Sequence, residues 1–111
     1  MLFVLFGLDR QEGGAAIRRR ERAAHLRFVI ENEGVFRYGG ALLDESGRMM
    51  GSLMLVELPD RAALGRFLAA EPYSRAGLFD PLIVRETRRV VPEPAPGFIA
   101  AELERETTGR A

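Results

Sequence analysis

The 111-residue sequence contains no cysteine, no lysine and a single histidine, His25. The lack of cysteine excludes disulfides, thiol nucleophiles and cysteine-ligated metal sites. One histidine leaves little from which to build a zinc or iron site, so we expect no metal or other cofactor. Because imidazole readily gains and loses a proton near neutral pH, His25 is the first candidate for proton transfer.

All sixteen cationic side chains are arginines, and the sixteen Asp and Glu residues balance them. This balance, without arginines clustered among aromatic residues, argues against a nucleic-acid partner. The apolar N-terminal run stops at Asp9, too short to span a membrane, and has neither the basic region nor the cleavage site of a signal peptide. We therefore expect a cytoplasmic protein with no membrane partner.

The chain reads as strand, helix, strand, strand, helix, strand and then a tail. Gly34 is expected to close the first helix, Asp60 to cap the second, and Pro72 and Gly77 to bracket a short helical turn. Pro81 is expected to open the last strand. The predicted strands cover residues 2–8, 36–43, 50–58 and 82–91, and the predicted helices cover 15–33, 60–70 and 98–106.

This order predicts an α+β, ferredoxin-like βαββαβ domain over residues 1–91, followed by a Pro-rich linker and short helix or tail over 92–111. The first and third strands should be central, and their stretches Leu2–Phe6 and Leu53–Val56 are apolar at every position. Two helices cover only one sheet face, so a second copy should cover the other, giving a homodimer joined through that face. The tail is a weaker alternative cover, and it could instead dock across a partner subunit.

His25 lies at the edge of the apolar face of the first helix. At 100° per residue it shares a narrow stripe with Arg18, Arg22 and Val29. An imidazole there could be half-buried beside two cations that bind an anionic ligand. The alternative is a boundary histidine satisfied by a backbone carbonyl, with the arginines on a solvated face.

Two further segments could contribute to a site. In residues 71–78 a proline and a glycine hold Glu71, Tyr73 and Ser74, although these residues could equally end a helix and cap the core. Gly39 and Gly40 follow Tyr38 inside a strand, where a bulge or a close approach by a ligand would require them. The serines lack the context of an acyl-enzyme nucleophile.

Taken in order, these segments resemble the YciI-like (YCII-related) family. The similarity lies in the N-terminal apolar strand, Arg22-Ala-Ala-His25-Leu26, Gly39-Gly40 and the acidic-Pro-Tyr segment from Glu71 to Leu78, and covers about residues 1–91. It implies a dimeric α/β barrel related to muconolactone isomerases and small monooxygenases. It also implies a pocket shared by His25 and Glu71, where the family usually has aspartate, and an activity of the kind seen in a dehydrochlorinase of a chlorinated hydroxyquinol.

The resulting hypothesis is a cofactor-free lyase or isomerase acting on a small anionic or enolisable molecule. His25 is the general acid/base and Glu71 orients it, while Arg22 and Arg18 hold the substrate. Tyr73 and Ser74 donate hydrogen bonds to a developing oxyanion, and Gly39 and Gly40 complete the substrate-binding set. The alternatives are a non-catalytic dimeric ligand-binding or accessory module and a cofactor-free monooxygenase.

Overall fold

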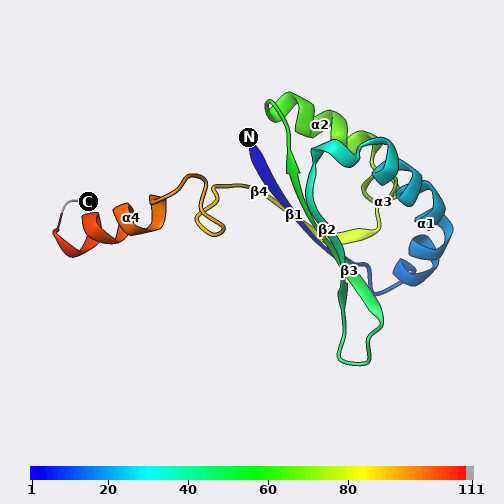
Figure 1. The fold of residues 1–111 in the computed structure, drawn as a ribbon. Helices are drawn as coiled ribbons and strands as arrows, with labels where there is room; N and C mark the ends of the chain where they lie inside the picture. The colour runs from blue at the N-terminus through cyan, green and yellow to red at the C-terminus, as the bar shows by residue number, and fades with distance from the viewer. Residues whose placement is uncertain (110–111) are drawn as a thin grey trace.

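The computed structural model describes residues 1–109 and has the predicted α+β, ferredoxin-like architecture (Figure 1). One four-stranded antiparallel sheet runs in the order β2-β3-β1-β4, so the first and third strands are central as expected. The strands are β1 (Leu2–Asp9), β2 (Phe36–Leu43), β3 (Met49–Glu57) and β4 (Phe79–Thr87), and the helices are α1 (Gly14–Glu31), η1 (Glu33–Val35), α2 (Arg61–Ala70), α3 (Pro72–Arg75) and α4 (Phe98–Thr107).

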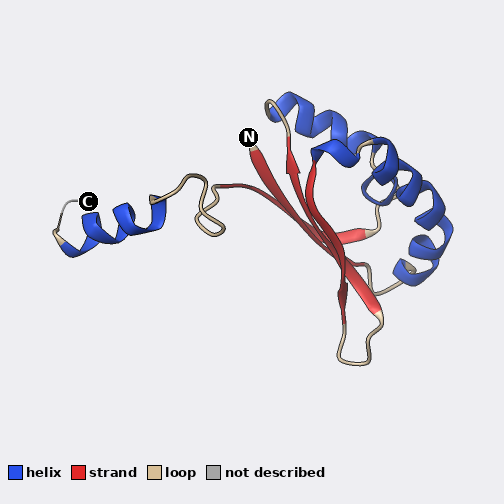
Figure 2. Ribbon diagram, viewed as in Figure 1, coloured by secondary structure: helices blue, strands red, loops and turns tan. Residues whose placement is uncertain are grey.

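Helices α1, α2 and α3 cover a single face of the sheet (Figure 2). Side chains alternate along β1, so that Phe3 and Leu5 are fully buried against the helices. Phe67 of α2 packs edge-on against Phe28 of α1. This core fixes α1 over β2 and β3, where the site described below lies.

The opposite face of the sheet, called here the outer face, has no helix over it (Figure 2). Most of its side chains on β1 and β3 are apolar and half-buried, because alternation along the central strands turns every second residue away from the helices. Polar side chains lie at one end of this face, namely Glu57, Arg85 and Thr87. The outer-face residues of the three strands β1, β3 and β4 include Leu2, Val4, Phe6, Leu8, Leu53, Leu55 and Ile83. Such a continuous apolar face is typical of a contact surface.

The first helix ends earlier than predicted, and Gly34 does not close it. The cap is Asn32, whose side-chain amide and backbone N–H both donate to the carbonyl of Phe28. Because Asn32 satisfies the terminal carbonyl, no left-handed glycine is needed, and Gly34 lies in the following 3₁₀ turn with a negative φ. The prediction for α2 is confirmed, since Asp60 accepts from the N–H of Ala63.

Strand β4 begins earlier and ends earlier than the predicted span of residues 82–91. It starts at Phe79, whose ring lies over Gly7, where a Cβ atom would come within 2.4 Å of that ring. Pro81 is therefore inside the strand, as an edge strand tolerates beside a register irregularity. Thr87 pairs with Leu2, and β1 offers no partner beyond that residue, so the strand stops there.

No bulge occurs at Gly39 and Gly40. The two register irregularities of β2 lie on either side, between Phe36 and Tyr38 and between Leu42 and Leu43, and the two glycines pair regularly with β3. No backbone approaches them, since the nearest groups to their missing Cβ atoms are the side chains of Phe36 and Tyr38. Gly39 pairs with the buried Met54 and so keeps a side chain out of the space between β2 and α1, whereas the missing Cβ of Gly40 faces Tyr38 on the outer face.

Candidate functional site

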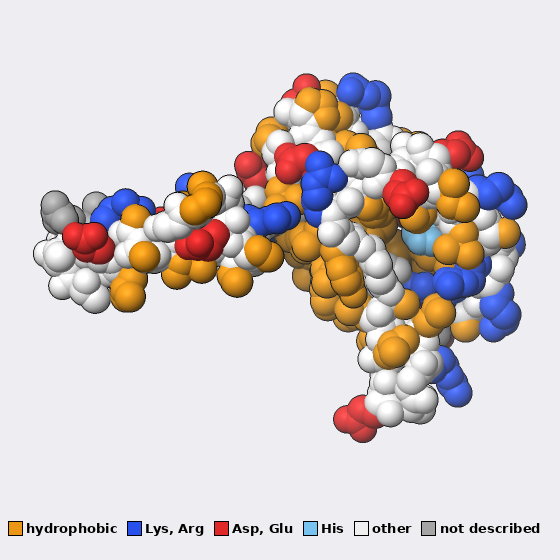
Figure 3. Space-filling view, viewed as in Figure 1, with side chains coloured by type: hydrophobic (Ala, Val, Ile, Leu, Met, Phe, Trp, Pro, Cys, Tyr) orange, Lys and Arg blue, Asp and Glu red, His pale blue; other side chains and the backbone are white. Residues whose placement is uncertain are grey.

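A cavity of about 270 Å³ lies between α1 and the β2–β3 half of the sheet. In Figure 3 the His25 side chain is visible at the bottom of a hollow that apolar and arginine side chains surround. Small-molecule sites usually occupy roughly 300–1,000 Å³, so this cavity suits a ligand of about one ring. Its lining residues are Arg18, Arg22, His25, Leu26, Val29, Phe36, Gly39, Gly40, Ala41, Ser52, Met54 and Tyr73.

His25 and Glu71 meet at the back of this cavity. The Nδ1 atom of His25 lies 2.6 Å from Oε1 of Glu71, whose side chain is completely buried. The partner of the imidazole is therefore a carboxylate and not a backbone carbonyl. In residues 1–109 this is the only hydrogen bond of the imidazole, so Nε2 is the nitrogen left for the cavity, and 14% of the side chain is exposed.

Local structure explains how a carboxylate can be buried there. Glu71 is the N-cap of α3, and Pro72 begins that helix at the position where its missing N–H costs nothing. Oε1 accepts from the N–H of Tyr73, and Oε2 accepts from both the N–H and the hydroxyl of Ser74. With the bond from His25, both carboxylate oxygens are satisfied without water.

These contacts keep Glu71 ionised. Burial alone would raise the pKa of Glu71, but the bond with His25 and the N–H groups of Ser74 and Tyr73 outweigh it and hold the pKa below its usual range. An ionised carboxylate only accepts hydrogen bonds, so the proton of the neutral imidazole must be on Nδ1. The lone pair is then on Nε2, which is the form of histidine that acts as a base.

Tyr73 connects the two halves of the site. Its ring stacks on the imidazole of His25 at 4.0 Å between centroids and 14° between planes, and the Arg18 guanidinium lies 4.8 Å from its centroid. The hydroxyl makes a long contact of 3.5 Å with Nη1 of Arg22. Tyr73 thus fixes the plane of the imidazole and presents its hydroxyl among the cavity's cations.

Arg18 is bound within the protein and is not a free anion receptor. Its Nε and Nη2 atoms donate to both carboxylate oxygens of Asp9, at 2.7 and 2.8 Å, and Nη2 also reaches Ser52. Burial would lower the pKa of Arg18, but Asp9 outweighs this effect and the pKa is raised, so the pair stays charged. The sequence analysis missed Asp9, although a carboxylate at a strand end beside an arginine-rich helix was a usable signal.

Arg22 is the cation of the site without a carboxylate. Within residues 1–109 no Asp or Glu oxygen lies in ion-pair distance of it, and its guanidinium contacts the hydroxyl of Tyr73 and the sulfur of Met49. Asp9 offsets Arg18, and the Glu71 carboxylate lies behind His25 and does not line the cavity, so Arg22 presents a positive charge at the cavity wall. This arrangement favours an anionic ligand.

The remaining predicted residues divide between the cavity and its supports. Gly39 and Gly40 line the cavity, whereas Ser74 does not, because its hydroxyl donates to Glu71. The predicted contact between Ser74 and a substrate oxyanion is thus replaced by a contact that holds the carboxylate. No group of three or more Asp, Glu, His or Cys side chains in the described part of the chain is arranged to bind a metal.

Comparison with known families assigns the chain. The family model of the YCII-related domain matches residues 1–88. This protein belongs to the YCII-related family. No curated protein matches the sequence significantly. In the described residues no helix is both long and apolar enough to cross a membrane.

A solved structure with similar architecture is that of 5-chloro-2-hydroxyhydroquinone dehydrochlorinase (TftG) from Burkholderia phenoliruptrix AC1100, in complex with 2,5-dihydroxybenzoquinone. The two proteins are 26% identical with a TM-score of 0.73, over 84% of this chain and 99% of that one. A structure of an antibiotic biosynthesis monooxygenase is 17% identical with a TM-score of 0.47, over 80% of this chain and 100% of that one. The match over residues 1–88 confirms the expected family, and the similarity to TftG confirms the expected ferredoxin-like fold of the single chain.

Proposed function

We propose that this protein is a cofactor-free lyase or isomerase that transfers a proton on a small anionic or enolisable molecule. The observation that carries the proposal is the pairing of His25 Nδ1 with the buried, ionised Glu71, which leaves Nε2 at the cavity. General acid/base catalysis requires a group that can exchange a proton with the substrate, and a carboxylate partner stabilises the protonated form of that group.

In the proposed reaction, Nε2 of His25 accepts a proton from a hydroxyl or acidic C–H group of the substrate. The imidazolium formed is stabilised by Glu71, and Arg22 and the Tyr73 hydroxyl contact the oxyanion that develops. If His25 returns the proton to a different atom, the product is an isomer. If a leaving group departs with its bonding electrons, proton and leaving group are lost together and the reaction is an elimination.

A hydroxylated six-membered ring is the substrate class to test first. The similar structure is a dehydrochlorinase in complex with 2,5-dihydroxybenzoquinone, a small acidic ring. The cavity here suits such a ring, because it has a volume for about one ring, apolar walls from residues such as Val29, Phe36 and Met54, and the positive charge of Arg22 at its wall. On this basis we propose elimination of HCl from a chlorinated hydroxyhydroquinone as a candidate activity.

We also propose that the protein acts as a homodimer joined through the outer face. An open sheet with a half-exposed apolar face is stabilised when a second sheet packs on it, and two copies provide that second sheet by symmetry. Sedimentation equilibrium should report a dimer, and a stable monomer at micromolar concentration would contradict this assembly.

The test of function measures chloride release from 5-chloro-2-hydroxyhydroquinone by the wild type and by His25→Ala, with binding of 2,5-dihydroxybenzoquinone followed by calorimetry. Release by the wild type and its loss in a folded His25→Ala variant would support the proposal. Binding without turnover would indicate the alternative of a ligand-binding module. Turnover that survives in His25→Ala would exclude His25 as the acid/base.

A further inference from the structure

The C-terminal arm, residues 92–109, is the part of the molecule that the proposed chemistry does not use. The family match ends at residue 88, so the arm lies beyond the shared domain. It leaves the end of β4 and carries α4 away from the rest of the protein, on the side of the sheet opposite to α1 and α2 (Figure 1). This is the side of the uncovered outer face.

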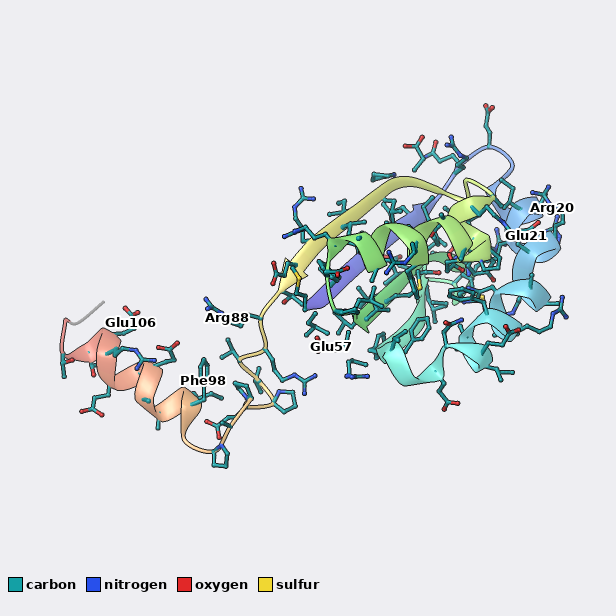
Figure 4. The ribbon with its side chains drawn as sticks, turned by 90° about the horizontal axis from the view of Figure 1, so that it is seen from above. Arg20, Glu21, Glu57, Arg88, Phe98 and Glu106 are labelled. Carbon is teal, nitrogen blue, oxygen red and sulfur yellow. The ribbon has the colours of Figure 1, made fainter. Side chains whose placement is uncertain are left out.

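Helix α4 has no buried residue, although two of its apolar side chains lie side by side. Ile99 and Leu103 are one turn apart on one face and are 39% and 63% exposed. In the view from above, the labelled Phe98 and Glu106 stand well clear of the sheet and its helices (Figure 4). Isolated helices shorter than about 12–15 residues are marginal in water, so this ten-residue helix requires a surface to pack on.

The charges of the arm and the domain are opposite. Residues 1–91 hold fourteen arginines and twelve acidic residues, a net charge of +2, whereas residues 92–109 hold one arginine and four glutamates, a net charge of −3. A groove of about 410 Å³ beside the outer face combines apolar Leu2 and Leu55 with the arginines 37, 88 and 89. An acidic helix with an apolar stripe would fit this groove, because the stripe would pack on the two leucines and the acidic side chains would face the arginines.

We propose that the arm is an intermolecular clasp, in which α4 of each copy packs its Ile99–Leu103 stripe on the groove beside the outer face of a second copy. The second copy is the occupant favoured here, because the arm projects on the side where that copy would sit and has the complementary charge. The clasp rests on the homodimer proposed above and adds a surface that the shared family domain lacks.

The first test is sedimentation equilibrium of the full chain, of a chain ending at residue 91, and of Leu103→Glu, with Ala101→Glu on the opposite side of α4 as the matched control. We expect the dissociation constant of the dimer to rise at least tenfold on truncation and in Leu103→Glu, and to change less than twofold in Ala101→Glu. The point variants keep the test valid if truncation impairs folding.

Three outcomes separate the clasp from the homodimer. Equal dimer affinity for the full chain, the truncated chain and Leu103→Glu would overturn the clasp and leave the sheet-to-sheet dimer intact. A monomeric full chain would overturn both. A weaker dimer in Leu103→Glu but not in Ala101→Glu supports both.

The second test locates the arm. Because the chain has no cysteine, Leu103→Cys can carry a single benzophenone label. Photolysis should give a product of twice the chain mass, cross-linked near Leu2 and Leu55. Cross-links confined within one chain would show that the arm folds back on its own domain, which would overturn the clasp.

Discussion

Two buried carboxylate pairs, Asp9–Arg18 and Glu71–His25, flank the ring of Tyr73. They differ in whether the cationic or basic partner keeps a nitrogen available to a ligand. Both anchor the α1 stripe to another element, with hydrogen bonds of 2.6–2.8 Å. Arg18 stays charged across the accessible pH range, and Asp9 and Ser52 satisfy it. His25 lines the cavity, and its hydrogen bond to Glu71 uses only Nδ1, which leaves Nε2 for a ligand.

The two pairs therefore suit different roles, one in stability and one in proton transfer. A buried pair of permanent charges holds structure, because removing either partner leaves an unpaired buried charge. The Glu71–His25 pair supports proton transfer, because Nε2 can accept a proton and the carboxylate stabilises the imidazolium that forms. The predictions below test whether the two pairs really differ in this way.

The largest effect is expected from His25→Ala. It removes the proposed acid/base and should lower kcat by roughly 10²–10⁴-fold, with the free energy of unfolding changed far less than the activity. The measurement is chloride release from 5-chloro-2-hydroxyhydroquinone, with circular dichroism as a check on folding. Arg27→Ala, an exposed position on the same helix, is the control and should keep wild-type turnover.

Asp9→Ala should break the scaffold pair. It leaves the Arg18 guanidinium buried without a counter-charge, and the free energy of unfolding should fall by about 3–5 kcal/mol in denaturant titrations. The matched control is Asp80→Ala, which removes an exposed ion pair with Arg10 and should cost less than about 1 kcal/mol. Equal losses in the two variants would contradict a structural role for Asp9.

Glu71→Asp tests the side-chain length that the contact between Glu71 and His25 requires. It keeps the charge but is one methylene shorter, so one carboxylate cannot hold both the α3 N–H groups and Nδ1 of His25 in their present positions. We expect kcat to fall by roughly 10–100-fold with KM nearly unchanged, since Glu71 does not line the cavity. An equal rise in KM would instead indicate that the substrate contacts this residue.

The smallest effect concerns stability in acid. The pKa of Glu71 is lower in the folded protein than in the unfolded chain, so its contribution is complete above the usual glutamate value and is lost as the pH falls through the folded pKa. The unfolding temperature of the wild type should therefore decrease as the pH falls below about 4.3. Glu71→Gln should reduce this slope, and an unchanged slope would exclude Glu71 as its source.

Part of the site was predictable from local sequence. Helical periodicity alone placed Arg18, Arg22 and His25 on one stripe, and all three line the cavity. The two glycines of β2 were expected at a bulge or a close approach, and they pair regularly with β3. Periodicity could not tell which arginine stays free, because that depends on Asp9 at the end of β1. It also could not foresee that Ser74 would donate to Glu71 and so turn away from the cavity.

The sequence by itself determined the order of strands and helices, the two central strands and the family, because apolar alternation, caps and turn residues act over a few positions. Only the tertiary structure decided where β4 ends, since the length of β1 limits its pairing, and which charges meet. Asp9 reaches Arg18 from a neighbouring element, and Glu71 reaches His25 from 46 residues away. Such pairings depend on how packed elements cross, which no local pattern specifies.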